Sequence, residues 1–357
     1  MVEVPKIVLE IKLPQETMKS PLAVELVLNA MHNTADGNWW AQYVKGEMRP
    51  WYSLELVSFG GQVKFMVWTE ARRKDGLIAA LYSQFPNISV QEVEDYARLV
   101  EFDPEKIKIW SCEMKFTKDN AYPIKTYVDY GLDKDPKEEF KVDPLTPGLE
   151  WLGSIKAGQQ VWIQMIVRAH KGEQTKEAHK LINEIMKRDE NTKVTGAEDE
   201  ETGMSKKPTM SPADQDLLDA LSRSITKPAF DVGIRAVYIS PKDLFSGEFG
   251  IGGIISFFKH FNTENLNGFR PNGDKWHAKF GFPWQDYKNI RRDYFSRKVL
   301  KAYRRRLYFM PPYLSKALVL NTEELATIYH FPGSVAATPT IERIPSKRAD
   351  APANLPI

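Results

Sequence analysis

The residues with the clearest capacity for chemistry form a run of cations near residue 300. Between Asp286 and Arg306 the sequence has nine basic and two acidic residues, which gives this segment a net charge of +7. Because the whole chain has a net charge of +2, the remaining residues sum to −5. If the segment is helical, Phe295, Val299 and Tyr303 recur on one apolar side and the cations fall on the other. Such a face can bind the phosphates of a nucleic acid.

Six of these cations make up the candidate site for phosphate or for a partner: Arg297, Lys298, Lys301, Arg304, Arg305 and Arg306. Four tyrosines are interleaved with the charges, at positions 287, 294, 303 and 308. Aromatic rings can stack on unpaired bases, although aromatic residues at helical spacing are more often part of a core. Two other interpretations stay open: a solvated helix balanced by acidic neighbours, and attraction to an anionic membrane or an acidic partner.

Residue patterns that are typical of enzymes do not occur elsewhere in the sequence. There is no G-x-x-x-x-G-K-[ST] phosphate-binding loop and no G-x-G-x-x-G after an expected strand. The six histidines show no spacing that would place two metal ligands on one helical face. The single cysteine, Cys112, lies inside an expected strand, which is typical of a packed side chain. We therefore expect no catalytic residue, cofactor or metal, while a site assembled from residues distant in sequence stays an open alternative.

Length and composition indicate a folded protein of about two domains. The chain has 357 residues, 42% hydrophobic and 27% charged. No segment is as long and apolar as a membrane helix, and the first residues lack the pattern of a secretion signal. One cysteine cannot form an internal disulfide, so we expect a cytoplasmic location.

The first hundred residues predict an α+β unit with the order β-α-β-β-α-β. Alternating or β-branched residues predict strands, and apolar residues at helical spacing predict helices. The expected strands are 6–13, 51–57, 63–68 and 89–97, and the expected helices are 21–31 and 72–85. This order is that of a ferredoxin-like fold, in which both helices cover one face of an antiparallel sheet.

A second α+β unit follows. Strands are expected at 107–116, 124–130, 160–169 and 230–239, and helices at 145–155 and 253–261. From residue 124 onward the order of elements repeats that of the first unit, with an insertion between the middle strands. The insertion is expected to have polar helices at 175–188 and 211–225, and between them a mobile acidic loop, 189–207, which has few large apolar residues.

These elements predict three regions. Residues 1–104 form the ferredoxin-like domain. Residues 105–320 form the second α+β domain, with its helical insertion at 171–227 and its basic helix at 286–308. Residues 321–357 form a short helix, capped by Thr322, and a Pro- and Ala-rich linker tail.

Motifs near both ends of the chain resemble one family. Residues 321–332 read Asn-Thr-Glu-Glu-Leu-Ala-Thr-Ile-Tyr-His-Phe-Pro and lead to the Pro- and Ala-rich end. Residues 52–57 read Tyr-Ser-Leu-Glu-Leu-Val, 81–86 read Leu-Tyr-Ser-Gln-Phe-Pro, and 93–96 read Val-Glu-Asp-Tyr. Together they resemble the region that precedes the motor domain in bacterial type IV secretion and conjugative DNA-transfer ATPases of the HerA/FtsK type.

The resemblance implies a non-catalytic module that docks on secretion-channel or motor ATPase proteins at the cytoplasmic face of the inner membrane and contacts DNA. Members of the group carry a membrane segment before this region and a Walker-type ATPase after it. Neither occurs in this chain, so no ATP or magnesium residue is carried over. We expect either a fragment that ends before the motor or a stand-alone relative, associated with the membrane through partners or through a missing segment, and oligomeric only together with the motor. The alternative is a free-standing nucleic-acid-binding protein that uses the basic helix 286–308.

Overall fold

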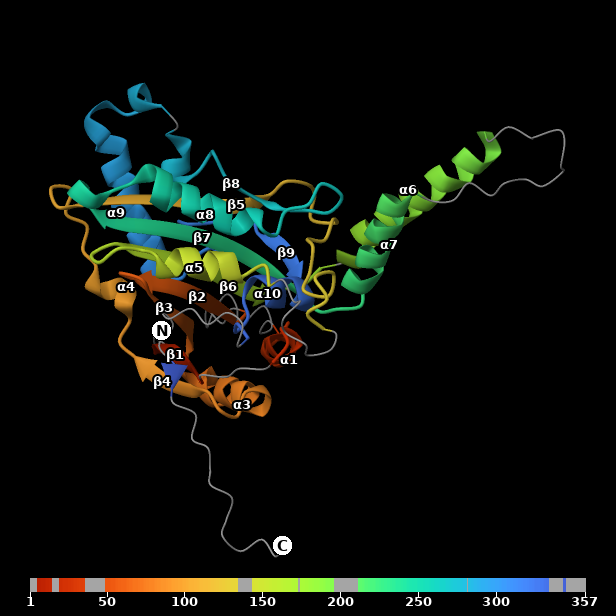
Figure 1. Ribbon diagram of the computed structural model, residues 1–357, viewed down its shortest axis with the longest axis horizontal. Helices are drawn as coiled ribbons and strands as arrows, with labels where there is room; N and C mark the ends of the chain where they lie inside the picture. The colour runs from red at the N-terminus through yellow and green to blue at the C-terminus, as the bar shows by residue number, and fades with distance from the viewer. Residues whose placement is uncertain are drawn as a thin grey trace, which may run out of the picture.

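One large β-sheet organises the described part of the chain (Figure 1). The computed structural model describes residues 5–14, 19–35, 49–133, 143–172, 174–195, 211–280, 282–333 and 343–344. The fold is α+β, as predicted. Strands β1 to β9 pair antiparallel, and the two-residue strand β10 (Arg343–Ile344) pairs parallel with the end of β1.

In the first half of the sheet the strands lie in the order β4-β1-β3-β2. Their bounds are Lys6–Pro14 for β1, Trp51–Phe59 for β2, Gln62–Glu70 for β3 and Ser89–Val93 for β4. The four predicted strand positions are confirmed, although β4 is shorter than predicted. It ends at Val93 because the Asp95 carboxylate accepts a hydrogen bond from the N–H of Ala97 and so begins helix α4 (Tyr96–Leu99).

The second half has the order β6-β7-β5-β8 and joins the first through β2 and β6, which pair from Trp51 with Arg168 to Phe59 with Gln160. The bounds are Ile107–Phe116 for β5, Gln160–Ala169 for β6, Ala229–Pro241 for β7 and Phe269–Pro271 for β8. Strand β9 (Leu318–Asn321) pairs with the start of β7. The two predicted domains therefore share one sheet, and the boundaries at residues 104 and 320 stay predictions.

Helices cover both faces of this sheet (Figure 1). One face packs against α1 (Leu22–Met31), α3 (Lys74–Gln84), α5 (Thr146–Gly153), α8 (Gly252–Lys259) and α10 (Thr322–Ile328). The other packs against α4 and α9 (Ile290–Arg304). Because successive side chains of a strand alternate, β6 contributes Ile163 to the first core and Trp162 to the second. Among the described residues, none of the helices combines the length and the apolar character needed to cross a membrane.

The insertion between β6 and β7 forms a helical arm that projects from the body (Figure 1). Its helices are α6 (Gln174–Thr195) and α7 (Pro212–Ser224), and their apolar sides meet at Ala178, Ile185, Leu217 and Leu221. Both predicted helices are confirmed. The predicted loop 189–207 is wrong at its start, because α6 continues to Thr195, and its residues from 196 onward lie outside the described part of the chain.

The predicted strand 124–130 is wrong, because this segment folds into turns. The N–H of Ile124 donates to the Glu324 carboxylate, and the N–H of Tyr127 donates to the Thr327 hydroxyl. In a sheet these two N–H groups would donate to a neighbouring strand, but here side chains of α10 accept their hydrogen bonds. The first strand of the second half is consequently β5.

Helix α10 is capped by Asn321 rather than by the predicted Thr322. The side chain of Asn321 accepts a hydrogen bond from the N–H of Glu324 (2.8 Å), and the Glu324 carboxylate accepts one from the N–H of Asn321 (2.8 Å). These reciprocal bonds form a capping box. The predicted linker tail after residue 344 lies outside the described residues.

Candidate nucleic-acid interface

Helix α9, at the centre of the basic segment, begins at Ile290, later than predicted. Lys288 and Asn289 have left-handed backbones, with φ of 52° and 59°, which ends any helix before them. The Asp286 carboxylate then accepts hydrogen bonds from the N–H groups of Arg291 (2.9 Å) and Arg292 (2.8 Å). It thereby satisfies two of the free donors at the start of the helix.

One side of α9 is a stripe of solvent-accessible side chains, which we call the α9 face: Arg291, Tyr294, Lys298, Lys301 and Arg305. These positions recur every three or four residues, so they lie on one side of the helix. No carboxylate in the described part of the chain forms an ion pair with any of the four cations. Their charge therefore stays available to an anion outside the fold.

The six predicted cations differ in exposure: some lie on the surface of α9 and others point into the fold. Lys298, Lys301 and Arg305 lie on the α9 face. Arg297 is also exposed, but its guanidinium lies over the ring of Phe102, 5.3 Å from the ring centre, beside the face. These four remain candidates for binding phosphate.

Arg304 and Arg306 point into the fold instead. The guanidinium of Arg304 donates to the backbone oxygens of Ala97 (2.8 Å) and Val100, at the end of α4. Arg306 is fully buried and pairs with Glu55 (2.9 Å) and Asp95 (2.5 Å). The prediction that Arg306 contacts phosphate is therefore wrong, and Arg304 has a structural role in joining α9 to α4.

The four tyrosines of residues 286–308 also divide into a buried and an exposed pair. Tyr303 and Tyr308 are buried, and the hydroxyl of Tyr303 lies 2.7 Å from that of Tyr96. Burial and the Glu55 carboxylate raise the pKa values of Tyr96 and Tyr303, so both stay neutral. Tyr287 and Tyr294 are 75% and 57% exposed. Only these two of the four can stack on a base.

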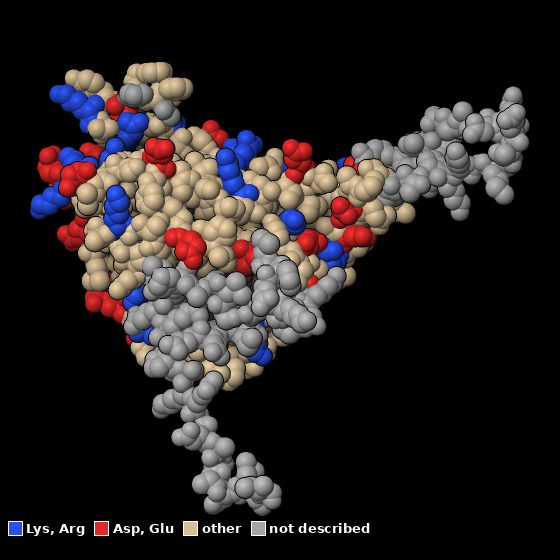
Figure 2. Space-filling view, viewed as in Figure 1, with Lys and Arg blue, Asp and Glu red and all other residues tan. Residues whose placement is uncertain are grey.

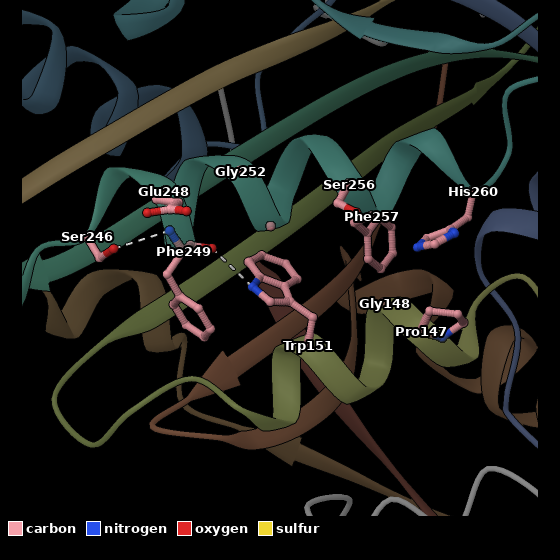
Figure 3. Close-up of a pocket in the computed structure, with 11 residues that line it drawn as sticks. Pro147, Gly148, Trp151, Ser246, Glu248, Phe249, Gly252, Ser256, Phe257 and His260 are labelled. Carbon is pink, nitrogen blue, oxygen red and sulfur yellow. Dashed lines mark hydrogen bonds between the residues drawn. The ribbon is translucent and has the colours of Figure 1, made fainter.

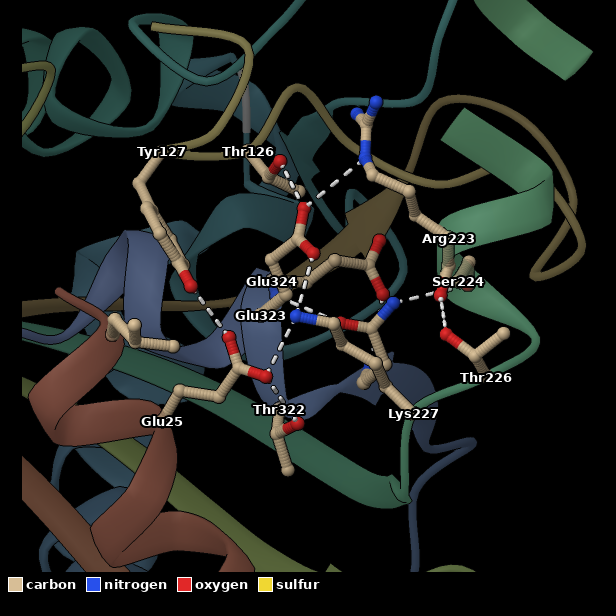
Figure 4. A network of polar contacts seen from close by, with 12 residues as sticks. Glu25, Thr126, Tyr127, Arg223, Ser224, Thr226, Lys227, Thr322, Glu323 and Glu324 are labelled. Carbon is tan, nitrogen blue, oxygen red and sulfur yellow. Dashed lines mark hydrogen bonds and ion pairs between the residues drawn. The ribbon is translucent and has the colours of Figure 1, made fainter. Parts of the chain in front are cut away.

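Buried carboxylates also gather around the motif at residues 321–324 (Figure 4). Lys227 reaches both Glu25 (2.7 Å) and Glu323 (2.8 Å), and the hydroxyl of Tyr127 donates to Glu25 (2.7 Å). Arg223, at the end of α7, lies 3.7 Å from Glu323. The network therefore joins α1, the base of the arm and α10.

The charges in this network balance one another. Burial alone would lower the pKa of Lys227, but Glu25 and Glu323 together raise it above its ordinary value. Burial raises the pKa of Glu324 to about 7, against the effect of two backbone N–H donors. Glu25 and Glu323 have a cationic partner in Lys227, and Glu324 is held by backbone donors, so the cluster joins α1, the base of the arm and α10.

A groove of about 410 Å³ lies between α5 and α8 (Figure 3). The indole N–H of Trp151 donates to the backbone oxygen of Phe249 (3.2 Å), so this hydrogen bond joins α5 to the helical turn Gly247–Ile251 that leads into α8. Glu248 and His260 lie at opposite ends of the groove in Figure 3. Because its titratable groups do not converge, the groove has no arrangement for acid–base chemistry.

Cysteine and the residue types that bind metals are further candidates for a site. Cys112 is buried in β5, and burial raises the pKa of its thiol. Within the described residues, no group of three or more His, Cys, Asp or Glu side chains is arranged to hold a metal ion.

Comparison with known proteins assigns the chain to a family without assigning it an activity. Residues 3–343 match the family described as "Domain of unknown function (DUF8128)". The chain belongs to this family. No curated protein matches it.

Among solved structures, this DUF8128 member is similar to a xylooligosaccharide oxidase from Myceliophthora thermophila C1 in complex with xylobiose, at 12% identity and a TM-score of 0.29. The match covers 96% of this chain and 56% of the oxidase, so the chain spans little more than half of that protein. A TM-score this low supports no conclusion about fold or function.

Sequence reasoning missed some surface residues of this DUF8128 member. Phe282, Trp284 and Ile290 are 54%, 78% and 65% exposed, just before and at the start of α9. The signal that could have revealed them is a cluster of large apolar residues between Gly281 and Arg291 whose spacing fits neither a helix nor a strand.

Proposed function

We propose that this chain is a non-catalytic binding module of a type IV secretion-like apparatus, and that the α9 face contacts the DNA that such an apparatus transfers. One observation carries the proposal: in the segment from Asp286 to Arg306, the buried arginine has carboxylate partners and the cations on the outer side of α9 have none among the described residues. Arg306 is matched by Glu55 and Asp95, whereas Lys298, Lys301 and Arg305 have no carboxylate partner among the described residues. A row of unpaired cations one or two helical turns apart suits the phosphates of a nucleic acid backbone.

The same proposal has the module dock on secretion-channel or motor ATPase proteins at the cytoplasmic face of the inner membrane. The projecting arm of α6 and α7 supports a role in protein contact, because a projecting helical pair exposes surface that the body does not cover (Figure 1). Glu323, from the motif that resembles those ATPases, pairs with Lys227 and Arg223 at the base of this arm. A partner that moves the arm would therefore act on α10.

We further propose that each half of the sheet is a ferredoxin-like unit. If the four strands of each half are numbered along the chain, both halves have the order fourth, first, third, second. In each half two helices, α1 with α3 and α5 with α8, pack on the same face. Both features are those of the ferredoxin-like arrangement and support the assignment.

A second candidate function is that of a free-standing nucleic-acid-binding protein. The same unpaired cations favour it, together with the exposed ring of Tyr294 among them. The two candidates differ in their dependence on a motor. Tight DNA binding by the isolated chain and no association with a purified secretion ATPase would favour the free-standing protein.

The test of the α9 face is a binding titration of the full chain with fluorescently labelled single- and double-stranded DNA at low salt. The variant Lys298→Glu/Lys301→Glu/Arg305→Glu is expected to bind at least about tenfold more weakly, because three phosphate partners become repulsive. The matched control, Lys156→Glu/Lys180→Glu/Lys259→Glu, reverses three exposed lysines on other elements and is expected to bind more tightly than the α9 variant. Equal losses in both variants, or no binding by the unmodified chain, would overturn the proposal.

A further inference from the structure

A second surface lies at the N-terminal end of α9, where the chain exposes large apolar side chains together. We call this surface the tip and define it by Phe282, Trp284, Tyr287 and Ile290. More than half of each of these side chains is exposed. Next to α9, the chain projects above the sheet at the upper left of Figure 1. Adjacent exposed apolar side chains of this size mark a surface for binding.

The tip is held in place by buried polar contacts beneath it. The ring of His277 is buried and lies 2.8 Å from the Ser111 hydroxyl on β5 and 3.0 Å from the Ser296 hydroxyl on α9. The guanidinium of Arg292 donates to the backbone oxygen of Phe280 (3.2 Å). Asp286 is bonded to the first turn of α9, as described above. The apolar side chains are therefore displayed from a fixed base.

The exposed charges around the tip are mostly positive. From Lys279 to Arg292 the sequence has four basic residues and one acidic residue, Asp286. Asp286 is buried, whereas Lys279, Lys288 and Arg291 are exposed. Figure 2 shows Lys and Arg atoms at the upper-left projection, together with some Asp and Glu atoms and a large share of uncharged surface. The net exposed charge of the tip is therefore positive.

We propose that the tip inserts into the headgroup region of an anionic lipid bilayer. Trp and Tyr favour the interface between water and hydrocarbon, and Phe and Ile favour the acyl boundary below it. Lys279, Lys288 and Arg291 would then face the negative headgroups, which attract cations close to the surface.

The geometry of the rings favours a lipid surface over unpaired bases as the occupant. The rings of Phe282 and Trp284 stack on each other, with centres 4.7 Å apart and planes 10° apart. One face of each ring is thus already covered, which leaves fewer faces for bases. A bilayer needs exposed apolar area at the end of a projection and no particular ring orientation.

This inference goes beyond the proposed function, and Arg291 is the one side chain named in both the α9 face and the tip. The α9 variant described above changes Lys298, Lys301 and Arg305, and the tip variants below leave all three unchanged. Failure of one proposal is therefore distinguishable from failure of the other.

The test is flotation of the full chain with vesicles of phosphatidylcholine alone and with vesicles that also contain phosphatidylglycerol. We expect binding to the anionic vesicles and little binding to the neutral ones. Phe282→Ser/Trp284→Ser is expected to weaken binding about tenfold or more, through lost apolar insertion. Lys279→Glu/Lys288→Glu, which leaves every residue of the α9 face unchanged, is expected to weaken it by about fivefold or more for each charge reversed.

The matched control is Leu22→Ser/Met186→Ser, which removes two exposed apolar side chains from α1 and α6. It is expected to float like the unmodified chain. No flotation with anionic vesicles, or equal flotation of the control and the Phe282→Ser/Trp284→Ser variant, would overturn the proposal. Loss of DNA binding in the Phe282→Ser/Trp284→Ser variant without any vesicle binding would overturn it in favour of a stacking surface for bases.

Discussion

The guanidinium of Arg306 lies 2.9 Å from the carboxylate of Glu55, and both side chains are fully buried between the sheet and α9. Arg306 has a left-handed backbone, with φ of 49°, just after the end of the helix. The N–H of Leu307 donates to the oxygen of Ala302, and that of Arg306 to the oxygen of Tyr303. This is the Schellman pattern, in which glycine is usual at the left-handed position. The buried ion pair compensates for placing an arginine there.

Removing Arg306 is expected to destabilise the fold strongly. Arg306→Met leaves Glu55 without a cationic partner in the core, and breaking such a pair costs about 3–5 kcal/mol. Arg305→Met, at an exposed neighbour, is expected to change stability by no more than about 0.5 kcal/mol. Urea unfolding followed by circular dichroism measures both. Similar losses in the two variants would contradict the burial of Arg306.

This pair also shows where sequence reasoning ends. Arg304, Arg305 and Arg306 are identical in type and consecutive, so nothing local distinguishes the exposed residue from the buried one. The distinction comes from the left-handed turn at Arg306 and from Glu55 and Asp95, which are more than 200 residues away in the chain. The amphipathic pattern predicted the helix and its buried side, but not the partners of its last residues.

Contacts between residues far apart in the chain also explain why the predicted strand at 124–130 is wrong. Its β-branched and aromatic residues predicted a strand, yet its N–H groups bond to Glu324 and Thr327. By contrast, β6 is a ten-residue run rich in apolar and β-branched residues and was predicted at its full length. Patterns that repeat along one element are readable from sequence, whereas a partner far along the chain is not.

Gly233 and Gly76 are expected to respond to alanine in opposite directions. A Cβ at Gly233 in β7 would lie 2.3 Å from the ring of Tyr308, so Gly233→Ala is expected to cost about 1–3 kcal/mol. A Cβ at Gly76 in α3 meets no described atom within 4 Å, so Gly76→Ala is expected to stabilise by about 0.5–1 kcal/mol. Thermal melts of the two variants test this. Equal shifts of the melting temperature would show that the ring of Tyr308 does not lie against β7.

Glu324 is expected to make stability depend on pH near neutrality. Burial raises its pKa from 4.5 to about 7, so the folded state holds this proton more tightly than the unfolded state. The resulting stabilisation is complete below about pH 4.5 and is lost as the pH rises through about 7, by an amount on the order of 3 kcal/mol. Glu324→Gln cannot titrate, so its melting temperature is expected to fall less between these pH values. Parallel pH profiles of the variant and the unmodified chain would contradict the shift.

Cys112 is expected to react only when the fold opens. Its side chain is buried, and burial together with the Glu113 carboxylate raises the pKa of the thiol, so little reactive thiolate forms. Labelling with a coloured disulfide reagent is expected to be slow in native buffer and to accelerate with urea in parallel with unfolding. Labelling of the native chain as fast as that of free cysteine would contradict its position in the core.

The most direct measurement of the role of the α9 face is the salt dependence of DNA binding. The logarithm of the affinity of the full chain for duplex DNA is followed against the logarithm of salt concentration, for the unmodified chain and for Lys298→Gln/Lys301→Gln/Arg305→Gln. Each lost phosphate contact removes about 0.9 from the slope, so the variant is expected to have a slope shallower by about 2–3. An unchanged slope in the variant, or no measurable DNA binding by the unmodified chain at low salt, would contradict the assignment of the α9 face to nucleic acid.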